Sequence, residues 1–220
     1  PRIIAFIEIY CNYQKKAKIN NYFMKILVAT TNLGKINEFK DIFPKKSKIL
    51  TLSDLSINKD IEETGKTFHQ NALLKAMEYN KLSNMPTISE DSGLEISYLN
   101  GEPGIYSARY GGESLSDQDR VDLVLEKLSD VPDDRRQARF ISVICGVGFK
   151  YEPIYSEGYI DGYIAKNKEG NNGFGYDPIF IPVGSEKTAA KMTKEEKNMI
   201  SHRRKSIDKF LKILRRDKII

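Results

Sequence analysis

The chain has 220 residues, of which 40% are hydrophobic, so it is long enough to bury a substantial core as one large domain or two small ones. Its 35 Lys and Arg against 30 Asp and Glu give a net charge of +5, which suits an anionic ligand such as nucleic acid or a phosphate compound but equally a plain solvated surface. Two cysteines, Cys11 and Cys145, exclude a disulfide framework and lie too far apart for a metal-binding pair, which favours small apolar residues in a reducing cytoplasm.

The first 23 residues read differently from the rest of the chain. Their apolar run, Ile3–Tyr10, is interrupted by Glu8, and no apolar run in the sequence approaches the roughly 18 residues that cross a bilayer. Lysines follow this run instead of preceding it, which is the wrong order for a signal peptide. We therefore expect residues 1–23 to be an extension outside the core fold and residues 24–220 to form a single domain.

From Met24 onward, strand and helix patterns alternate. Short β-branched or apolar runs predict strands at Lys25–Thr30, Lys48–Leu52 and Thr87–Ser89. Apolar residues at helical intervals predict helices at Gly34–Phe43, about Thr67–Leu82 and Asp117–Leu128. Two long strands with a hairpin-like connection are predicted at Ala138–Phe149 and Pro153–Ala165. This order indicates one α/β domain with mixed strand pairing and two lobes across a cleft.

Two helix starts carry capping-box spacing. Thr67 stands three residues before Gln70, and Thr193 stands three residues before Glu196. The chain ends in a basic amphipathic helix whose apolar side is built from Ile207, Phe210, Leu211 and Leu214.

Glu90 and Asp91 form an acidic pair in the stretch SEDSGLEI. The preceding strand would deliver this pair at its C-terminal end, in a turn rich in Ser and Gly. Adjacent carboxylates cost energy unless a metal ion, a basic partner or solvent compensates them. Glu63 also lies at an element end, and the strand ends of an open α/β sheet collect ligand-binding loops. Taken alone, Glu63 is equally explained by the dipole of the helix that follows it.

The segment Thr30–Lys35 passes from a strand to a helix, where free backbone N–H groups and the helix dipole attract anions. It lacks the Walker pattern GxxxxGK[ST], so an ordinary turn with a solvated lysine is an open alternative. Together with Lys75 and the three carboxylates, however, Lys35 would complete a magnesium–phosphate site, because Mg²⁺ takes a few carboxylates, several waters and substrate phosphate oxygens.

A glycine-rich loop at Gly170–Phe180 carries Phe174 and Tyr176, followed by Asp177. An aromatic face with a polar group beside it suits a nucleobase, although structural aromatics in a tight turn are an equal alternative.

The last helix begins at Ser201–Arg204, where His202 and Arg203 can donate hydrogen bonds to a ligand. The other histidine, His69, lies next to an apolar residue inside a helix and is expected to be structural.

In their order along the chain, these motifs resemble the inosine triphosphate pyrophosphatase family, which acts on nucleoside triphosphates with non-standard purines. The resemblance extends from about Met24 to the C-terminal helix. It rests on TTNLGK, EETGKTFHQNALLKA, SEDSGLEI, GEPGIYSARYGG, PDDRRQARF, GFGYDPIF and KTAAKMTKEEKNMISHR. It implies an ITPase-like α/β fold with a mixed β-sheet flanked by helices and two lobes around a central cleft.

The resemblance also implies roles for individual residues. Glu63 and Asp91 would bind Mg²⁺, and Asp91 would be the general base. Substrate would be bound by Thr30, Asn32, Lys35, Lys75, Ser92, Phe174, Gly175, Tyr176, Asp177, Lys197, His202 and Arg203. One departure is Glu90, since many relatives have two adjacent aspartates, so Glu90 is left as either a metal ligand or a residue behind the metal ligands.

The implied reaction converts ITP, dITP or XTP to the monophosphate and pyrophosphate, with water attacking the α-phosphorus. Donors at Lys197, His202 or Arg203 would pair with the carbonyl at purine position 6, and adenine would leave them unpaired. The same resemblance suggests a homodimer. From the residues themselves we expect a cytoplasmic protein with no membrane span and no stable nucleic-acid partner.

Two alternatives stay open from the residues. One is a phosphatase or pyrophosphatase that uses the same acidic pocket on other nucleotides. The other is a nucleic-acid-binding module that uses the cations of the last helix, Arg203, Arg204, Lys205, Lys209 and Lys212.

Overall fold

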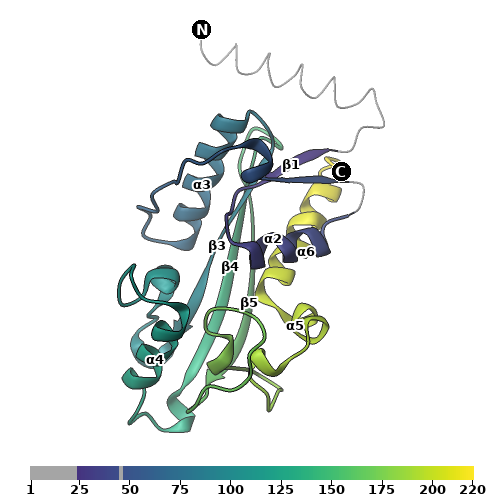
Figure 1. Cartoon of the computed structure of the whole chain (residues 1–220). Coiled ribbons are helices and arrows are strands. Elements are labelled where there is room, and N and C mark those ends of the chain that lie inside the picture. The colour runs from purple at the N-terminus through teal and green to yellow at the C-terminus, as the bar shows by residue number, and fades with distance from the viewer. Residues whose placement is uncertain (1–23, 45–46) are drawn as a thin grey trace.

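A six-stranded mixed sheet runs through the computed structural model, which describes residues 24–44 and 47–220 (Figure 1). The strand order is β2-β1-β3-β4-β5-β6, and β1 pairs in parallel with both β2 and β3, whereas the remaining pairs are antiparallel. The strands are β1 Lys25–Val28, β2 Lys48–Thr51, β3 Thr87–Ile96, β4 Gln137–Val147, β5 Ile154–Ile164 and β6 Phe180–Pro182. The predicted mixed α/β sheet is confirmed.

Five α-helices flank the sheet in the described part of the chain. They are α2 Leu33–Ile42, α3 Phe68–Ser83, α4 Asp117–Lys127, α5 Lys194–Ile200 and α6 His202–Arg216. Short 3₁₀ helices lie at Ser53–Leu55, Ser97–Leu99, Gly104–Arg109, Asp133–Arg135, Asp177–Ile179 and Ala189–Lys191. In Figure 1, α3 and α4 lie on one side of the long strands, and α2, α5 and α6 lie on the other.

The two predicted helix caps formed to different extents. At α5 the capping box is complete, because the side chains of Thr193 and Glu196 each accept a backbone N–H of the other residue. At α3 only half of the box formed: Thr67 accepts from the Gln70 N–H, but the Gln70 side chain accepts from the Lys66 N–H at 2.6 Å. The prediction of both helix starts is confirmed.

The acidic pair lies in the middle of β3, and the predicted turn at Glu90 and Asp91 is wrong. Both residues are in register with β4, where Glu90 stands opposite Ile144 and Asp91 opposite Val143. The glycine after this pair serves close packing instead of a chain reversal. A Cβ at Gly93 would lie 2.3 Å from the Gly104 carbonyl oxygen, so β3 needs glycine there to let the next segment approach.

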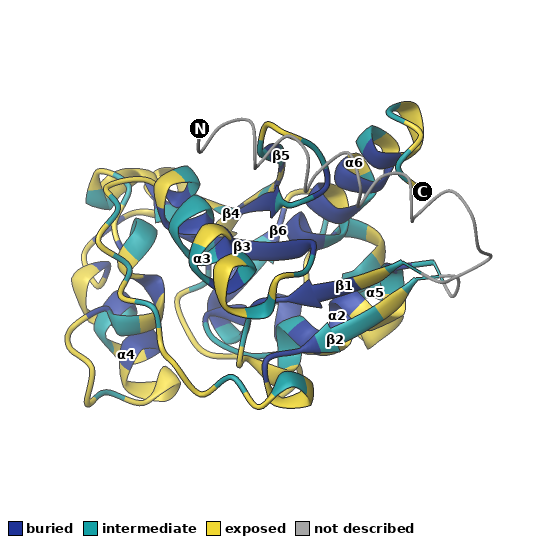
Figure 2. Cartoon of the chain, turned by 90° about the horizontal axis from the view of Figure 1, so that it is seen from above, coloured by how far each residue is buried: buried dark blue, intermediate teal, exposed yellow. Residues whose placement is uncertain are grey.

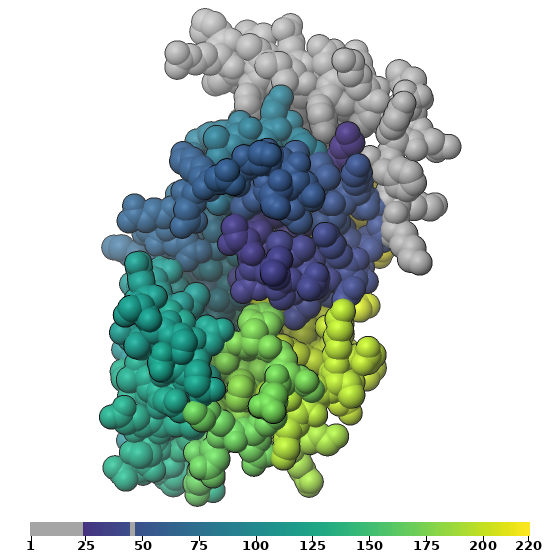
Figure 3. All heavy atoms as spheres, viewed as in Figure 1, coloured from purple at the N-terminus to yellow at the C-terminus, as the bar shows by residue number. Residues whose placement is uncertain are grey.

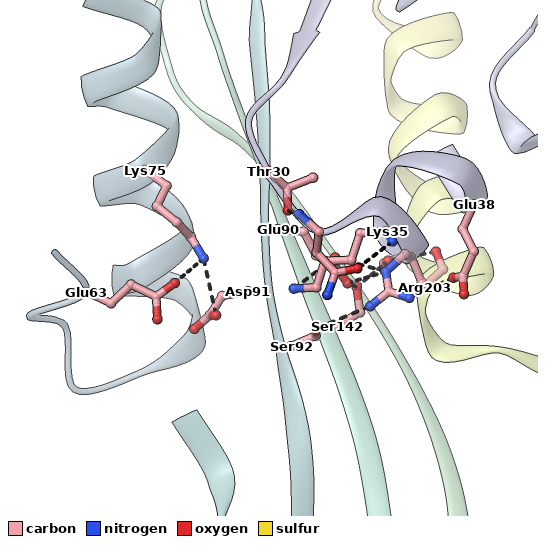
Figure 4. Close-up of polar contacts among 12 residues, drawn as sticks. Thr30, Lys35, Glu38, Glu63, Lys75, Glu90, Asp91, Ser92, Ser142 and Arg203 are labelled. Atoms are coloured by element: carbon pink, nitrogen blue, oxygen red, sulfur yellow. Dashed lines mark hydrogen bonds and ion pairs between the residues drawn. The ribbon is translucent and has the colours of Figure 1, made fainter. Parts of the chain in front are cut away.

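Because side chains alternate along a strand, this position sends the two acids to opposite faces of the sheet. Glu90 points toward α6 and Asp91 toward α3, as Figure 4 shows. The strand therefore divides the acidic motif into two sites with different partners.

The hydrophobic core lies along the strands, which are the darkest elements between the helices in Figure 2. The apolar side of α6 is buried as predicted, with Ile207, Phe210, Leu211 and Leu214 all at most 3% exposed. A second cluster around Leu94, Val124 and Phe180 fills the other end of the sheet. Between these ends, Figure 3 shows α2 and its neighbours in purple and blue meeting the teal and green residues of the lower part. This junction holds the candidate site.

Residues 1–23, predicted to be an extension, lie outside the described part of the chain. Cys145 is buried in the core as predicted, and Cys11 lies outside the described residues. Among the helices of the described residues, none combines the length and the apolar character needed to cross a membrane.

Candidate active site

Two carboxylates and a lysine converge on the α3 face of the sheet. Glu63 comes from the segment ahead of α3, Lys75 from the middle of α3, and Asp91 from β3. Lys75 Nζ donates a short hydrogen bond to Glu63 Oε1 and lies 3.4 Å from Asp91 Oδ1. Arg109 adds a second cation, with its Nη1 3.0 Å from Glu63 Oε2. Glu63 and Asp91 thus share one cationic group, as Figure 4 shows.

The two carboxylates respond differently to this environment. Burial raises the pKa of Asp91, and the attraction of Lys75 is too weak to reverse that effect. Burial also raises the pKa of Glu63, but Lys75 and Arg109 together outweigh it and hold the pKa below its ordinary value. The same environment therefore shifts the two pKa values in opposite directions.

Asp91 is also incompletely bonded. Its Oδ2 atom is buried and has no hydrogen-bond partner among the described residues, and the same holds for the nearby Asn71 Nδ2. Asn71 lies close enough to lower the Asp91 pKa, yet the two atoms do not meet hydrogen-bond geometry. A buried carboxylate oxygen of this kind needs a further donor or cation.

A separate ion-pair network occupies the α6 face. Arg203, only 1% exposed, places Nε 2.8 and 2.9 Å from the two Glu90 oxygens and Nη1 2.7 Å from Glu38. Ser142 donates to Glu90 at 2.7 Å, and Lys35 Nζ lies 3.4 Å from the same carboxylate. Although burial alone would raise the pKa of Glu90, Arg203 and Lys35 hold it far below the ordinary glutamate value. Glu90 is thus a fully paired anion that does not face Glu63 and Asp91.

The start of α2 is shaped by its own side chains. Asn32 caps the helix by accepting the Lys35 N–H at 3.0 Å, and the Asn32 N–H donates to Thr30 Oγ1 at 3.2 Å. Burial lowers the pKa of Lys35 despite its ion pair with Glu90. A cation that is only partly compensated stands at a helix N-terminus, where an anion is stabilised.

A pocket of about 130 Å³ lies between α2, α4, α6 and the glycine-rich loop. Most of the substrate-binding residues predicted from the sequence line it, namely Asn32, Lys35, Ser92, Phe174, Gly175, Tyr176, Asp177, Lys197, His202 and Arg203. Thr30, Glu63, Lys75 and Asp91 are not in its lining. The pocket is therefore continuous with the start of α2 and separate from the acidic group on the α3 face.

Two cations lie close to the Phe174 ring. Lys197 Nζ lies 4.8 Å and the Arg203 guanidinium carbon 5.6 Å from the centre of its ring. Asp177 fixes the loop, because its Oδ2 accepts the Phe174 N–H at 2.8 Å and also bonds Lys197. A Cβ at Gly173 would collide with that Asp177 oxygen, so glycine is required there. The loop thus presents a rigid aromatic face beside fixed charges.

His202 and Tyr176 complete the walls. The His202 ring stacks on Phe140 with ring centres 5.0 Å apart, and burial lowers its pKa well below the ordinary histidine value. His202 is therefore neutral at physiological pH, with one N–H donor and one acceptor. The Tyr176 hydroxyl donates to the Ser107 carbonyl at 2.9 Å, which ties the loop to the segment after β3.

Several residues of this region were not singled out from the sequence. Glu38 and Arg109 hold predicted residues in place, and Ser107, Asp117 and Arg120 line the pocket. The quoted stretch GEPGIYSARYGG contains two of them, but it carries no pattern that assigns a task to a single residue. Conversely, His69 pairs with Glu157 at 2.8 Å, in line with its expected structural role.

Comparison with known proteins gives a consistent picture. A model of the Ham1 family matches residues 26–213. The dITP/XTP pyrophosphatase of Staphylococcus aureus (strain MW2) is 46% identical over 194 residues, which is 88% of this chain and 98% of that protein.

Solved structures agree. The Staphylococcus aureus Ham1 protein superimposes with a TM-score of 0.80 at 45% identity, covering 88% of this chain and 99% of its own. A Ham1 protein from Coxiella burnetii gives a TM-score of 0.81 at 36% identity, covering 88% of this chain and 100% of its own.

Proposed function

The chain belongs to the Ham1 family, and from that premise we propose that it hydrolyses nucleoside triphosphates with non-standard purines, such as dITP, XTP and ITP, to the monophosphate and pyrophosphate. The observation that carries the proposal is the set of three groups that the fold gathers around β3 and the start of α2. An aromatic pocket at Phe174 leads to Lys35 at a helix start, and Glu63 and Asp91 stand with Lys75 on the other side of β3. The pocket would bind the base, Lys35 and the start of α2 would bind the polyphosphate, and the acidic group would bind the attacking water.

The polyphosphate would lie between the two lysines. Lys35 has a pKa lowered by burial, so a bound phosphate would relieve the cost of its charge. Asn32 and Thr30 hold the start of α2 in a geometry that favours an anion. For Lys75, the pull of Asp91 and Glu63 outweighs burial and raises the pKa, so this lysine stays charged beside the reaction.

The residues present fit a magnesium ion, which we propose as the cofactor. The described residues contain no group of three or more His, Cys, Asp or Glu side chains that could hold a metal. The protein would therefore supply only a few of the ligands of the ion. Glu63 and Asp91 already converge on one cation, and Asp91 Oδ2 lacks a partner. Hard oxygen ligands completed by phosphate and water suit Mg²⁺. Bound there, the ion would neutralise charge that develops on the phosphate oxygens.

Asp91 would be the general base. Its pKa, raised by burial, makes it a better proton acceptor than an ordinary aspartate. Lys75 lies 3.4 Å from Asp91 Oδ1 and would help to orient its carboxylate. A proton of the attacking water would pass to Asp91 as the oxygen attacks the α-phosphorus.

The base pocket would select purines by their donors and acceptors. Lys197 and Arg203 offer only N–H donors, and neutral His202 offers one, all suited to a carbonyl at purine position 6. Adenine carries an amine at that position and would leave buried donors unpaired, which discriminates strongly.

A substrate panel with product analysis tests this function. Wild type with Mg²⁺ is expected to release pyrophosphate from ITP, dITP and XTP far faster than from ATP. Asp91→Asn is expected to lose at least about a thousandfold in kcat, as when a general base acts together with charge stabilisation. Asp122→Asn, an exposed aspartate paired with Lys168, is the matched control and is expected to retain activity. Stepwise release of orthophosphate would instead support a phosphatase.

We further propose that the protein works as a homodimer in the cytoplasm. The buried thiol of Cys145 is compatible with a reducing compartment. Sedimentation of the full chain would measure its oligomeric state, and a monomer at micromolar concentration would contradict the dimer.

A further inference from the structure

Arg120 is a buried arginine that borders the base pocket without a completed set of hydrogen bonds. It lies in the first turns of α4 and is 8% exposed. Its guanidinium has two contacts among the described residues, both long: Nη1 to Asp117 Oδ1 at 3.2 Å and Nη2 to the Gly112 carbonyl at 3.5 Å. Its Nε is buried and has no hydrogen-bond partner within the described part of the chain. A buried donor left unpaired in this way is costly.

The other buried arginines of the described chain show what a structural role requires. Arg136 donates to the carbonyls of Leu128, Val131, Ile164 and Ala165, three of these bonds being 2.7 or 2.8 Å. Arg203 bonds two carboxylates, through Nε to Glu90 and through Nη1 to Glu38. Arg120 has only one long contact of each kind, to the Asp117 carboxylate and to the Gly112 carbonyl, so its position is poorly explained by packing alone. A ligand in the adjoining pocket would supply the missing acceptor.

The direction from which Arg120 reaches the pocket restricts that acceptor. α4 and α6 flank the long strands on opposite sides in Figure 1, and both contribute to the pocket lining. His202 and Arg203, the donors proposed for purine position 6, come from α6. A base lying on Phe174 with position 6 toward α6 turns the opposite side of its six-membered ring, positions 2 and 3, toward α4.

We propose that Arg120 reads position 2 of the purine base and thereby sets the preference among purine triphosphates. This inference rests on the proposed function and names a specificity residue for it. Arginine carries N–H donors and no acceptor. Xanthine has a carbonyl oxygen at position 2 that accepts from Arg120, and hypoxanthine has a C–H there, which is tolerated without a bond.

Guanine, which shares the carbonyl at position 6, carries an amino group at position 2. That amino group would face the donors of Arg120, so both partners would stay unpaired in a buried site. Arg120 thus supplies a physical reason for rejecting GTP that the donors at position 6 cannot supply. Among the described residues, Asp117 is the carboxylate that contacts Arg120, through its Oδ1 atom.

The test compares Arg120→Gln with wild type on XTP, ITP and GTP. Loss of one charge-assisted hydrogen bond is expected to lower kcat/KM for XTP by about 10- to 100-fold. For ITP the change is expected to stay within about threefold, because no bond to position 2 is lost. GTP hydrolysis is expected to rise relative to XTP, since glutamine offers an acceptor and Asp117 is released. Arg135→Gln, at an exposed arginine, is the matched control and is expected to leave all three ratios unchanged.

Binding of products to the full chain provides a readout that does not require turnover. Wild type is expected to bind XMP more tightly than IMP, and Arg120→Gln is expected to reduce that difference. Arg120→Met, which keeps the bulk of the side chain without a donor, is expected to remove it and serves if the glutamine variant is unstable. Equal losses for XTP and ITP, or equal XMP and IMP affinities in wild type, would overturn the assignment. Failure of wild type to release pyrophosphate from any of these nucleotides would overturn the proposed function instead, whatever the binding order.

Discussion

Glu90 and Asp91 are neighbours in the chain but have opposite energetic roles. Glu90 is enclosed by Arg203, Lys35 and Ser142, and these partners hold its pKa far below the ordinary value. Asp91 has its pKa raised by burial and one oxygen without a partner. The folded protein therefore favours the charged form of Glu90 and disfavours that of Asp91.

Neutralising each residue should separate stability from activity. Glu90→Gln is expected to lower the free energy of unfolding by about 3 kcal/mol or more, because Arg203 loses a buried partner. For Asp91→Asn, the free energy of unfolding is expected to be no more than about 1 kcal/mol below that of wild type and can be higher, whereas turnover is lost. Urea denaturation at neutral pH with parallel activity assays would measure both. Strong destabilisation by Asp91→Asn would show that Asp91 is a structural anion.

The lowered pKa of Glu90 also predicts how its contribution to the free energy of unfolding depends on pH. Since the pKa of Glu90 is lower in the folded state than in the unfolded state, its stabilising effect is complete above the ordinary glutamate value of 4.5. It disappears as the pH falls further, through the folded-state pKa. The difference in unfolding free energy between wild type and Glu90→Gln should therefore be constant from pH 7 to about 5 and shrink below about 4.5. A difference that grows on acidification would contradict this assignment.

Among the elements, the helices and most strands could be predicted because their signals are local. Apolar spacing and caps locate α3 and α4 to within one residue, and the hydrophobic side of α6 is visible in the sequence. The course of β3 could not be predicted in the same way. Its Ser and Gly residues resemble a turn, and what makes them a strand is pairing with β4, some 50 residues later. Non-local pairing of this kind has no signature in the segment itself.

Two helices that carry different parts of the site are joined by one buried ion pair. Glu38 of α2 bonds Arg203 of α6, so the proposed phosphate end and the proposed base end of the pocket are tied together. Glu38→Gln is expected to raise KM for ITP about three- to tenfold with kcat nearly unchanged, because Arg203 loses half of its support while Asp91 is untouched. Steady-state kinetics would measure this, with exposed Glu62→Gln as the control. An equal loss in kcat would place Glu38 in the chemical step.

For the whole molecule, the sheet explains why the site has two separate parts. Alternation along β3 gives one acid to the α3 face and one to the α6 face, and the start of α2 lies at the edge between them. Resemblance of ordered motifs was sufficient to predict most pocket residues. It could not point to Glu38 or Arg120 as site residues. Glu38 bonds Arg203, which is distant in the sequence, and Arg120 lines a pocket whose other residues come close only in the folded chain.

The position of the core also bears on the first 23 residues. The match to the Ham1 family begins at residue 26, and β1 begins at Lys25. The described core clusters, and both ion-pair groups of the site, are built from residues between 24 and 220. If residues 1–23 are an extension outside the fold, their removal takes away none of these contacts. The chain from Met24 is therefore expected to unfold within about 0.5 kcal/mol of the full chain, as for changes away from buried features.

Its kcat/KM for ITP should likewise stay within about twofold of the full-chain value, because Lys35, Asp91 and Arg203 keep their partners. Urea denaturation and pyrophosphate release, measured side by side on the two chains, would check this. A large loss of stability would mean that the N-terminal segment covers part of the core. A loss of activity at unchanged stability would mean instead that the segment contributes to the site, directly or through a second copy of the chain.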